Sequence, residues 1–185
     1  MTDLDPSLPA LLFSIRRSVR YHHRRQRFFD NVHHWKTALA LLAGSATMVT
    51  LLPHVDTRLP LAFAALVTVL STLDLVWGTT LKARLHTDLA RRFLELERTI
   101  TLTKDPTEAD LRTWAAQRLL IKAEEPPVLR VLTLLCHNEV LLAMDGPRSE
   151  LYDVPGFKRL LAPFMTLSDE AICKVGERTT EGVRR

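Results

Sequence analysis

The sequence WKTALALLAGSATMVTLLPHVDTRLPLAFAALVTVLSTLDLVW, residues 35–77, decides the fold of this chain. It contains two apolar runs, about Trp35–Leu52 and Leu59–Thr79, joined by a short connection that begins at Pro53. At about 1.5 Å of rise per residue, the runs reach roughly 27 and 30 Å as helices, which matches a hydrocarbon core of about 30 Å. The stretch therefore predicts two antiparallel membrane-spanning helices in a tight hairpin.

Basic residues on both sides of this hairpin predict its orientation. Seven Lys and Arg residues lie in residues 16–36 and four in residues 82–92, whereas the connection holds only Arg58. The positive-inside rule then places both termini in the cytoplasm. Trp35 opens the first run and Trp77 nearly closes the second, so we expect both indoles to anchor the hairpin at the cytoplasmic interface.

Residues 7–34 predict an amphipathic helix with an arginine-rich face. They lack glycine, and proline is absent after Pro9. The arginines are Arg16, Arg17, Arg20, Arg24, Arg25 and Arg27. Because the run lies directly before an apolar segment, we expect these side chains to contact anionic lipid or acidic groups of a neighbouring subunit, and we expect no nucleic acid partner. The sequence leaves open whether this helix continues straight into the first run or bends along the membrane surface.

Beyond residue 80 the pattern stays helical. Leucines at helical spacing predict that the second membrane helix extends as one long helix toward Pro106. Thr107 followed by acidic residues predicts a helix that ends near Ala123, and Glu124-Glu125-Pro126-Pro127 predicts the start of a helix over residues 127–144 that closes at Asp145-Gly146.

The chain is thus predicted to be all-α and organised in four parts. Residues 1–34 form the basic N-terminal helix and residues 35–80 the two-span hairpin. Residues 81–178 form a cytoplasmic helical region, and residues 179–185 a disordered tail.

Asp74 is the most informative single residue, since a carboxylate in a membrane helix is costly and usually faces a bundle interior or a wet path. It shares a helix face with small and polar residues that we single out as pore-lining or helix-packing candidates. These candidates are Thr68, Ser71, Asp74 and Gly78 in the second run, with Ala40 and Gly44 in the first. Of the two interpretations we favour helix packing. A pore would require several copies, because two helices cannot enclose a water path.

The sequence gives only weak support for metal binding or catalysis. The seven histidines lack the i, i+4 spacing of a zinc helix, and the chain has no phosphate-binding glycine loop and no nucleophile motif. Two pairs of adjacent residues could be imagined in catalytic roles. A helix start explains Glu124 and Glu125. Burial on a leucine-rich helix face explains Cys136, which stands next to His137. We therefore predict no catalytic site, no metal and no cofactor.

Two arginine-rich segments, RSVRYH at residues 17–22 and RRQRFF at residues 24–29, precede two apolar runs and a long inward helix. This pattern resembles the SLATT family, two-span bacterial proteins associated with nucleotide-second-messenger conflict systems. The later segments EEPP at 124–127 and CHNE at 136–139 are similar to uncharacterised bacterial and phage proteins near that family.

The resemblance implies an oligomeric effector of the bacterial inner membrane that permeabilises the membrane when a cytoplasmic protein or a nucleotide signal acts on it. It supplies no catalytic residues. The alternative is a membrane-anchored scaffold or adaptor, in which the hairpin only tethers and the cytoplasmic helices recruit a protein. A metal- or thiol-dependent enzyme ranks third.

Overall fold

The computed structural model describes residues 7–49, 58–164 and 172–176, without the side chains of residues 46–49, 59–60 and 73–77. The predicted tail, the end of the first apolar run and nearly all of the connection lie outside the described residues. Within the described part of the chain the regular structure is helical, and Tyr152 and Lys174 form an isolated antiparallel bridge instead of a strand. The prediction of an all-α chain is confirmed.

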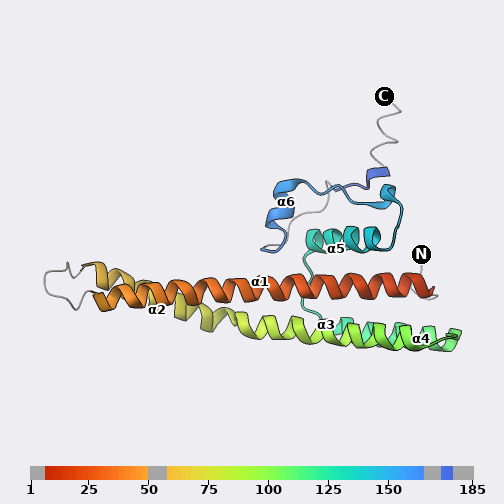
Figure 1. The fold of residues 1–185 in the computed structure, drawn as a ribbon, viewed down its shortest axis with the longest axis horizontal. Helices are drawn as coiled ribbons and strands as arrows, with labels where there is room; N and C mark the ends of the chain where they lie inside the picture. The colour runs from red at the N-terminus through yellow and green to blue at the C-terminus, as the bar shows by residue number, and fades with distance from the viewer. Residues whose placement is uncertain (1–6, 50–57, 165–171, 177–185) are drawn as a thin grey trace, which may run out of the picture. The chain divides into compact units, whose positions relative to one another are not determined.

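The chain divides into two units (Figure 1). Residues 25–86 form what we call the hairpin unit, and residues 1–24 with 87–185 form the core unit. Two helices contribute to both units, α1 (Leu8–Val49) and α3 (Thr79–Leu102). The others are α2 (Arg58–Trp77) in the hairpin unit, and α4 (Glu108–Ala123), α5 (Arg130–Ala143), the 3-10 turn η1 (Arg148–Glu150) and α6 (Gly156–Leu161) in the core unit.

Helix α1 answers the question that the sequence left open about the N-terminal segment. It is one α-helix of 42 residues that passes Trp35 without a break. Pro9 lies in its first turn, where the missing N–H costs nothing, and no further proline or glycine occurs before Gly44. The basic segment and the first apolar run therefore share one helix.

The prediction of one long helix through residue 80 is wrong, because Gly78 separates α2 from α3. Its φ of 54° lies in the left-handed region, which a residue with a Cβ adopts only at a cost. The carbonyl of Gly78 accepts the first hydrogen bond of α3 from the Lys82 N–H at 3.0 Å. Gly78 is thus a helix end, and it does not continue the stripe of small and polar residues along α2.

The ends of α4 and α5 follow the local signals in the sequence. Thr107 caps α4 in a capping box with Asp110, as the order of residues predicts. Helix α5 ends at Ala143, and Gly146 donates its N–H to the Leu141 carbonyl at 2.8 Å. Asp145, with φ 52°, is the left-handed residue at this helix end, and a Cβ on Gly146 would lie 2.4 Å from a Leu141 methyl carbon, so the Leu141 side chain would have to shift to admit a larger residue.

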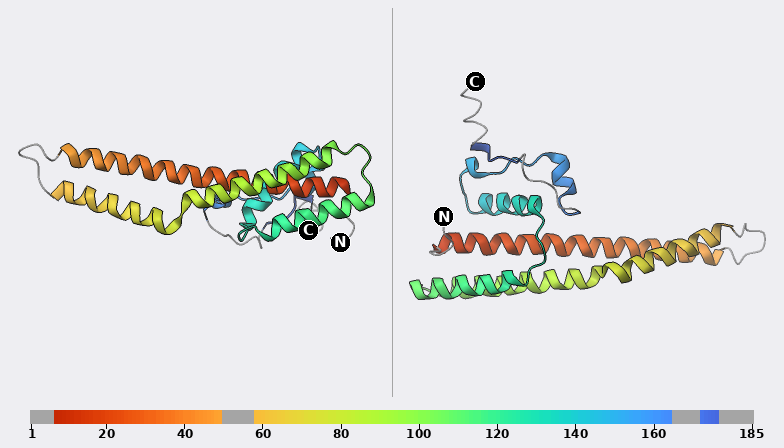
Figure 2. Two further views of the ribbon diagram at one scale, coloured as in Figure 1. Left: turned by 90° about the horizontal axis from the view of Figure 1, so that it is seen from below. Right: turned by 180° about the vertical axis from the view of Figure 1, so that it is seen from behind.

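A first cluster of buried side chains joins α1, α3 and α4 of the core unit, which lie side by side in Figure 2. Its members follow each other three or four positions apart along α1 and α3 and seven positions apart along α4, spacings that place residues on one face of a helix. They are Leu11, Ile15, Val19, Leu89, Phe93, Leu96, Ile100, Trp114 and Ile121. The part of α3 that joins this cluster therefore begins at Leu89, whereas Leu81 and Leu85 of the predicted leucine pattern are exposed.

A second cluster joins Tyr21 of α1 to α5 and the segment that follows α5. Asn138 of α5 fixes this segment with its side-chain amide, which donates to the Tyr152 carbonyl at 2.7 Å and accepts from the Tyr152 N–H at 2.9 Å. Cys136 is fully buried in the same cluster, as predicted from its place on the leucine-rich face of α5.

We expect Leu96→Ala to lower the free energy of unfolding of the core unit by about 2–5 kcal/mol, the usual cost of emptying a packed leucine site. Leu94→Ala is the matched control, because Leu94 lies on the same helix and is 43% exposed whereas Leu96 is 1% exposed. Urea unfolding of the detergent-purified chain, followed by circular dichroism, measures both changes. Equal losses for the two variants would contradict the assigned core face of α3.

Candidate functional site

The candidate site is the outer surface of the hairpin unit. In this unit α2 lies beside the C-terminal part of α1 and runs antiparallel to it (Figures 1 and 2). Lys36 of α1 donates to the Thr79 hydroxyl at 2.8 Å, just after the end of α2. Trp35 and the backbone of Trp77 therefore lie at the same end of the hairpin. The prediction that both indoles anchor the hairpin at one interface requires this arrangement.

Aromatic and cationic groups gather at this end of the hairpin. Phe29 stacks on His86 with ring centroids 5.7 Å apart, and the Arg25 guanidinium lies 4.5 Å from the centre of the Phe29 ring. Phe29 and His86 are both buried. Stacking and cation–π contacts thus hold α1 against the start of α3.

Large apolar side chains of the hairpin unit are exposed both at this end and farther along its helices. Trp35 has 72% of its surface accessible and Leu42 has 68%. The other exposed large apolar residues described in this unit are Leu39, Leu41, Leu61, Leu66, Val69, Leu81 and Leu85. The buried ones described are small or aromatic, namely Ala43, Ala83 and Phe29. This many exposed large apolar side chains in one unit indicate a surface that another apolar phase or another protein covers.

The predicted small and polar residues lie on this surface. Thr68 and Ser71 are exposed, and the Thr68 hydroxyl donates to the Ala64 carbonyl at 2.9 Å, so its polarity is satisfied along α2. Asp74 lies in α2 with its side chain outside the description, as does that of Trp77. A pore-lining or packing role for Thr68, Ser71 and Asp74 stays a prediction.

The pair Ala40 and Gly44 suggested close helix contact. Ala40 is half-buried, but a Cβ built on Gly44 would meet no atom within 4 Å. Described residues of the same chain therefore do not use the space that Gly44 leaves, and Ala43 is the buried residue at this level of α1. Close contact at Gly44 would need an atom from outside the described residues, such as one of a second copy.

Several of the predicted lipid- or subunit-binding arginines have partners inside the core unit. Arg16 donates to Glu97 of α3 at 2.6 Å, and Arg24 pairs with Glu139 of α5. Sequence analysis missed both pairs, because residues 81 and 115 positions apart give no local signal. Arg27 is exposed, and Arg17 and Arg20 are half-buried. Lipid or inter-subunit contact by the run stays a prediction.

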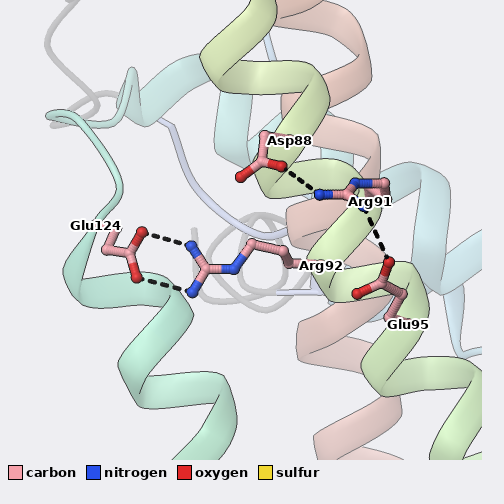
Figure 3. Close-up of polar contacts among 5 residues, drawn as sticks. All are labelled: Asp88, Arg91, Arg92, Glu95 and Glu124. Carbon is pink, nitrogen blue, oxygen red and sulfur yellow. Dashed lines mark hydrogen bonds and ion pairs between the residues drawn. The ribbon is translucent and has the colours of Figure 1, made fainter.

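The prediction that Glu124 and Glu125 begin a helix is wrong. Both follow the end of α4, and Glu124 is its C-cap. Figure 3 shows that Arg92 of α3 reaches Glu124 with both terminal nitrogens, at 2.5 and 2.8 Å. This two-bonded contact lowers the pKa of the Glu124 carboxyl. Next to it, Arg91 pairs with Asp88 and Glu95 along the surface of α3 (Figure 3).

Glu125 points inward and meets a buried histidine. The carboxylate oxygen Oε1 lies 3.1 Å from Nε2 of His22, a side chain with no exposed surface that also stacks on Phe93. A carboxylate can only accept, so Nε2 donates the proton of this bond. His137 lies edge-on between the rings of Phe13 and Tyr152, and burial lowers its pKa. Packing against aromatic rings accounts for the positions of both histidines, together with the Glu125 contact of His22. No group of three or more metal-ligating side chains occurs among the described residues.

Two further findings bear on the site. Among the residues that the structure describes, no helix combines the length and the apolar content that crossing a bilayer requires. The predicted first run continues past Val49 into residues outside the description. No family model, no curated protein and no solved structure matches the chain. Inferences about function therefore depend on the surfaces of the chain itself.

The reactivity of the two cysteines tests the packing of the core unit. It also shows which thiol could support a thiol-dependent activity. Burial raises the pKa of Cys136 to about 12, whereas Cys173 is exposed. Because the thiolate is the reactive form, we expect N-ethylmaleimide at neutral pH to modify Cys173 within minutes and to leave Cys136 untouched in the folded chain. Mass spectrometry of the two peptides measures this. Rapid modification of Cys136 would contradict its assigned burial.

Proposed function

We propose that this chain is an oligomeric, two-span membrane effector of the bacterial inner membrane. In this proposal the hairpin unit lies in the bilayer, and the core unit lies in the cytoplasm and controls assembly or opening. The proposal rests on one observation, the contrast between the two units. The core unit buries leucine, isoleucine and phenylalanine between three helices, whereas the hairpin unit directs its leucines outward.

Lipid is the covering that fits this surface best. The exposed side chains occur on α1, α2 and the start of α3, so a partner with one binding face would leave some of them in water. Acyl chains solvate all sides of a hairpin equally. The basic residues cluster with Trp35 at one end, where headgroups and a cytoplasmic orientation favour them.

An oligomer follows from geometry if the protein permeabilises the membrane. Two helices cannot enclose a water path, so several hairpins must surround an axis. The exposed Thr68 and Ser71 and the open space at Gly44 are available to neighbouring copies. Small and hydroxyl-bearing residues are typical of helix contacts in membranes. The triggering partner, a cytoplasmic protein or a nucleotide signal, is implied by the family resemblance alone.

A second function, the membrane-anchored scaffold, is supported by α6. Phe157, Leu160, Leu161 and Phe164 are exposed on and just after this short helix in the core unit. An apolar cluster of this kind is typical of a protein-docking site. In this alternative the hairpin tethers the chain and forms no pore.

Membrane insertion can be tested by placing charge on the apolar surface. We expect the double variant Leu41→Lys, Leu42→Lys to shift the protein from the membrane to the soluble or degraded fraction, because each lysine near a helix centre costs about 2.5–3.5 kcal/mol on insertion. Carbonate extraction and ultracentrifugation of expressing cells measure the distribution.

The matched control is Leu119→Lys, Leu120→Lys in α4. Leu42 and Leu120 are each 68% exposed, and Leu41 and Leu119 are 67% and 52% exposed, so all four positions are accessible and the two variants differ chiefly in the unit that they alter. We expect the control to stay with the membranes. A wild-type chain that remains in the supernatant as a compact monomer without detergent would overturn the proposal.

Permeabilisation separates the effector from the scaffold. We expect the purified oligomer to release a small dye from liposomes, and Asp74→Leu to change the rate or the ion selectivity of release by removing a charge from the polar stripe. Asp105→Leu, outside the hairpin unit, serves as the control and is expected to behave like wild type. Liposomes that stay sealed with every trigger tried would favour the scaffold.

A further inference from the structure

A cavity in the core unit lies where α1, α4 and α5 meet. Its volume is about 120 Å³ and one side is open to solvent. Residues from both sides of the α4–α5 connection line it, together with one face of α1. The lining residues are Arg17, Ser18, Tyr21, Lys122, Glu125, Val128 and Thr133. At about 30 Å³ per water molecule, the space holds a few waters or one compact polyatomic ion.

The cavity carries an excess of positive charge. Arg17 and Lys122 line it, and Arg118 lies one helical turn before Lys122 on the same side of α4. Glu125 is the acid in the lining, and its Oε1 is already engaged by His22. The lining therefore holds two cations and one carboxylate, and that carboxylate has another partner.

The arginines show the cost of this imbalance. Nε of Arg118 is buried and has no hydrogen-bond partner among the described residues. Burial, followed by the charge of Arg118, lowers the pKa of Arg17. The Arg17 guanidinium lines the cavity next to a like charge, and this proximity costs free energy that an anion bound in the cavity would restore.

The wall of the cavity that the α4–α5 connection forms is held in place by hydrogen bonds within the chain. The Tyr21 hydroxyl accepts the Leu129 N–H at 3.0 Å, and the Thr133 hydroxyl donates to the Leu129 carbonyl at 3.1 Å. Tyr21 is itself buried in the second cluster. The connection between α4 and α5 is therefore fixed by α1 and α5, and a ligand would not need to order it on binding.

We infer that this cavity binds the phosphate group of a small molecule, with Arg17 and Lys122 as the cationic contacts and the Ser18 hydroxyl as a neutral donor. A phosphate suits the site better than a carboxylate, because it presents oxygens in several directions to cations on two helices and carries up to two charges. The open side leaves room for the remainder of the ligand. The inference concerns the core unit alone and holds whether or not the hairpin unit enters a bilayer.

The test is calorimetric titration of the full chain in detergent with inorganic phosphate, pyrophosphate and, for comparison, acetate at matched ionic strength. We expect saturable binding of the phosphates and none of acetate. Lys122→Gln and Arg17→Gln are each expected to weaken binding at least tenfold, since each removes one of the cations. Arg112→Gln, which removes an exposed cation from the same helix, is expected to bind as wild type does.

Lys122 is exposed, so its substitution leaves the packing intact and keeps the test valid even if Arg17→Gln fails to fold. A parallel titration with vesicles of phosphatidylcholine, with and without phosphatidic acid, identifies the source of the phosphate. Dependence on Lys122 in the soluble arm indicates a free metabolite, and dependence in the vesicle arm alone indicates a lipid headgroup. No saturable binding in either arm, or equal loss with Arg112→Gln, would overturn the inference.

Discussion

Two helices side by side cannot bury the apolar residues that they carry, and this constraint determines how the rest of the molecule is interpreted. Each helix offers its partner one narrow face, so most of its circumference stays outside the contact. In the hairpin unit that contact takes in Ala43 and Ala83, while Leu41, Leu42 and Leu61 remain exposed. In the proposed function, lipid or further copies of the chain cover this apolar surface.

The core unit meets the same constraint with a third helix. Leu11, Ile15 and Val19 of α1 pack against Phe93 and its neighbours on α3, and Trp114 and Ile121 of α4 close the third side. Helix α1 supplies both units without a break, so one helix changes from a face buried by protein to an exposed apolar surface. The change follows its sequence, which is rich in arginine before Phe28 and rich in leucine and alanine after Trp35.

Sequence analysis succeeded where the cause is local and failed where it is not. The Thr107 cap, the Gly146 helix end and the burial of Cys136 depend on residues within a turn or two, and all three predictions are confirmed. Gly78 was treated as part of a continuous helix, because leucine spacing alone does not reveal a backbone in the left-handed region. The partners of Glu124 and Glu125 come from other helices, and only the packed fold identifies them.

The arginine run shows why a charge pattern does not define one surface. Arg16 and Arg24 lie eight positions apart, and both are neutralised by acids of the core unit, Glu97 and Glu139. Arg17 is turned by one position relative to Arg16, about 100° around α1, and instead faces the cavity beside Arg118 and Lys122. Glu125 lines the same cavity and attracts Arg17, but its Oε1 is engaged by His22, and burial together with Arg118 still lowers the pKa of Arg17. Its presence there is better explained by an anion that arrives from outside the chain than by the stability of the three helices around it.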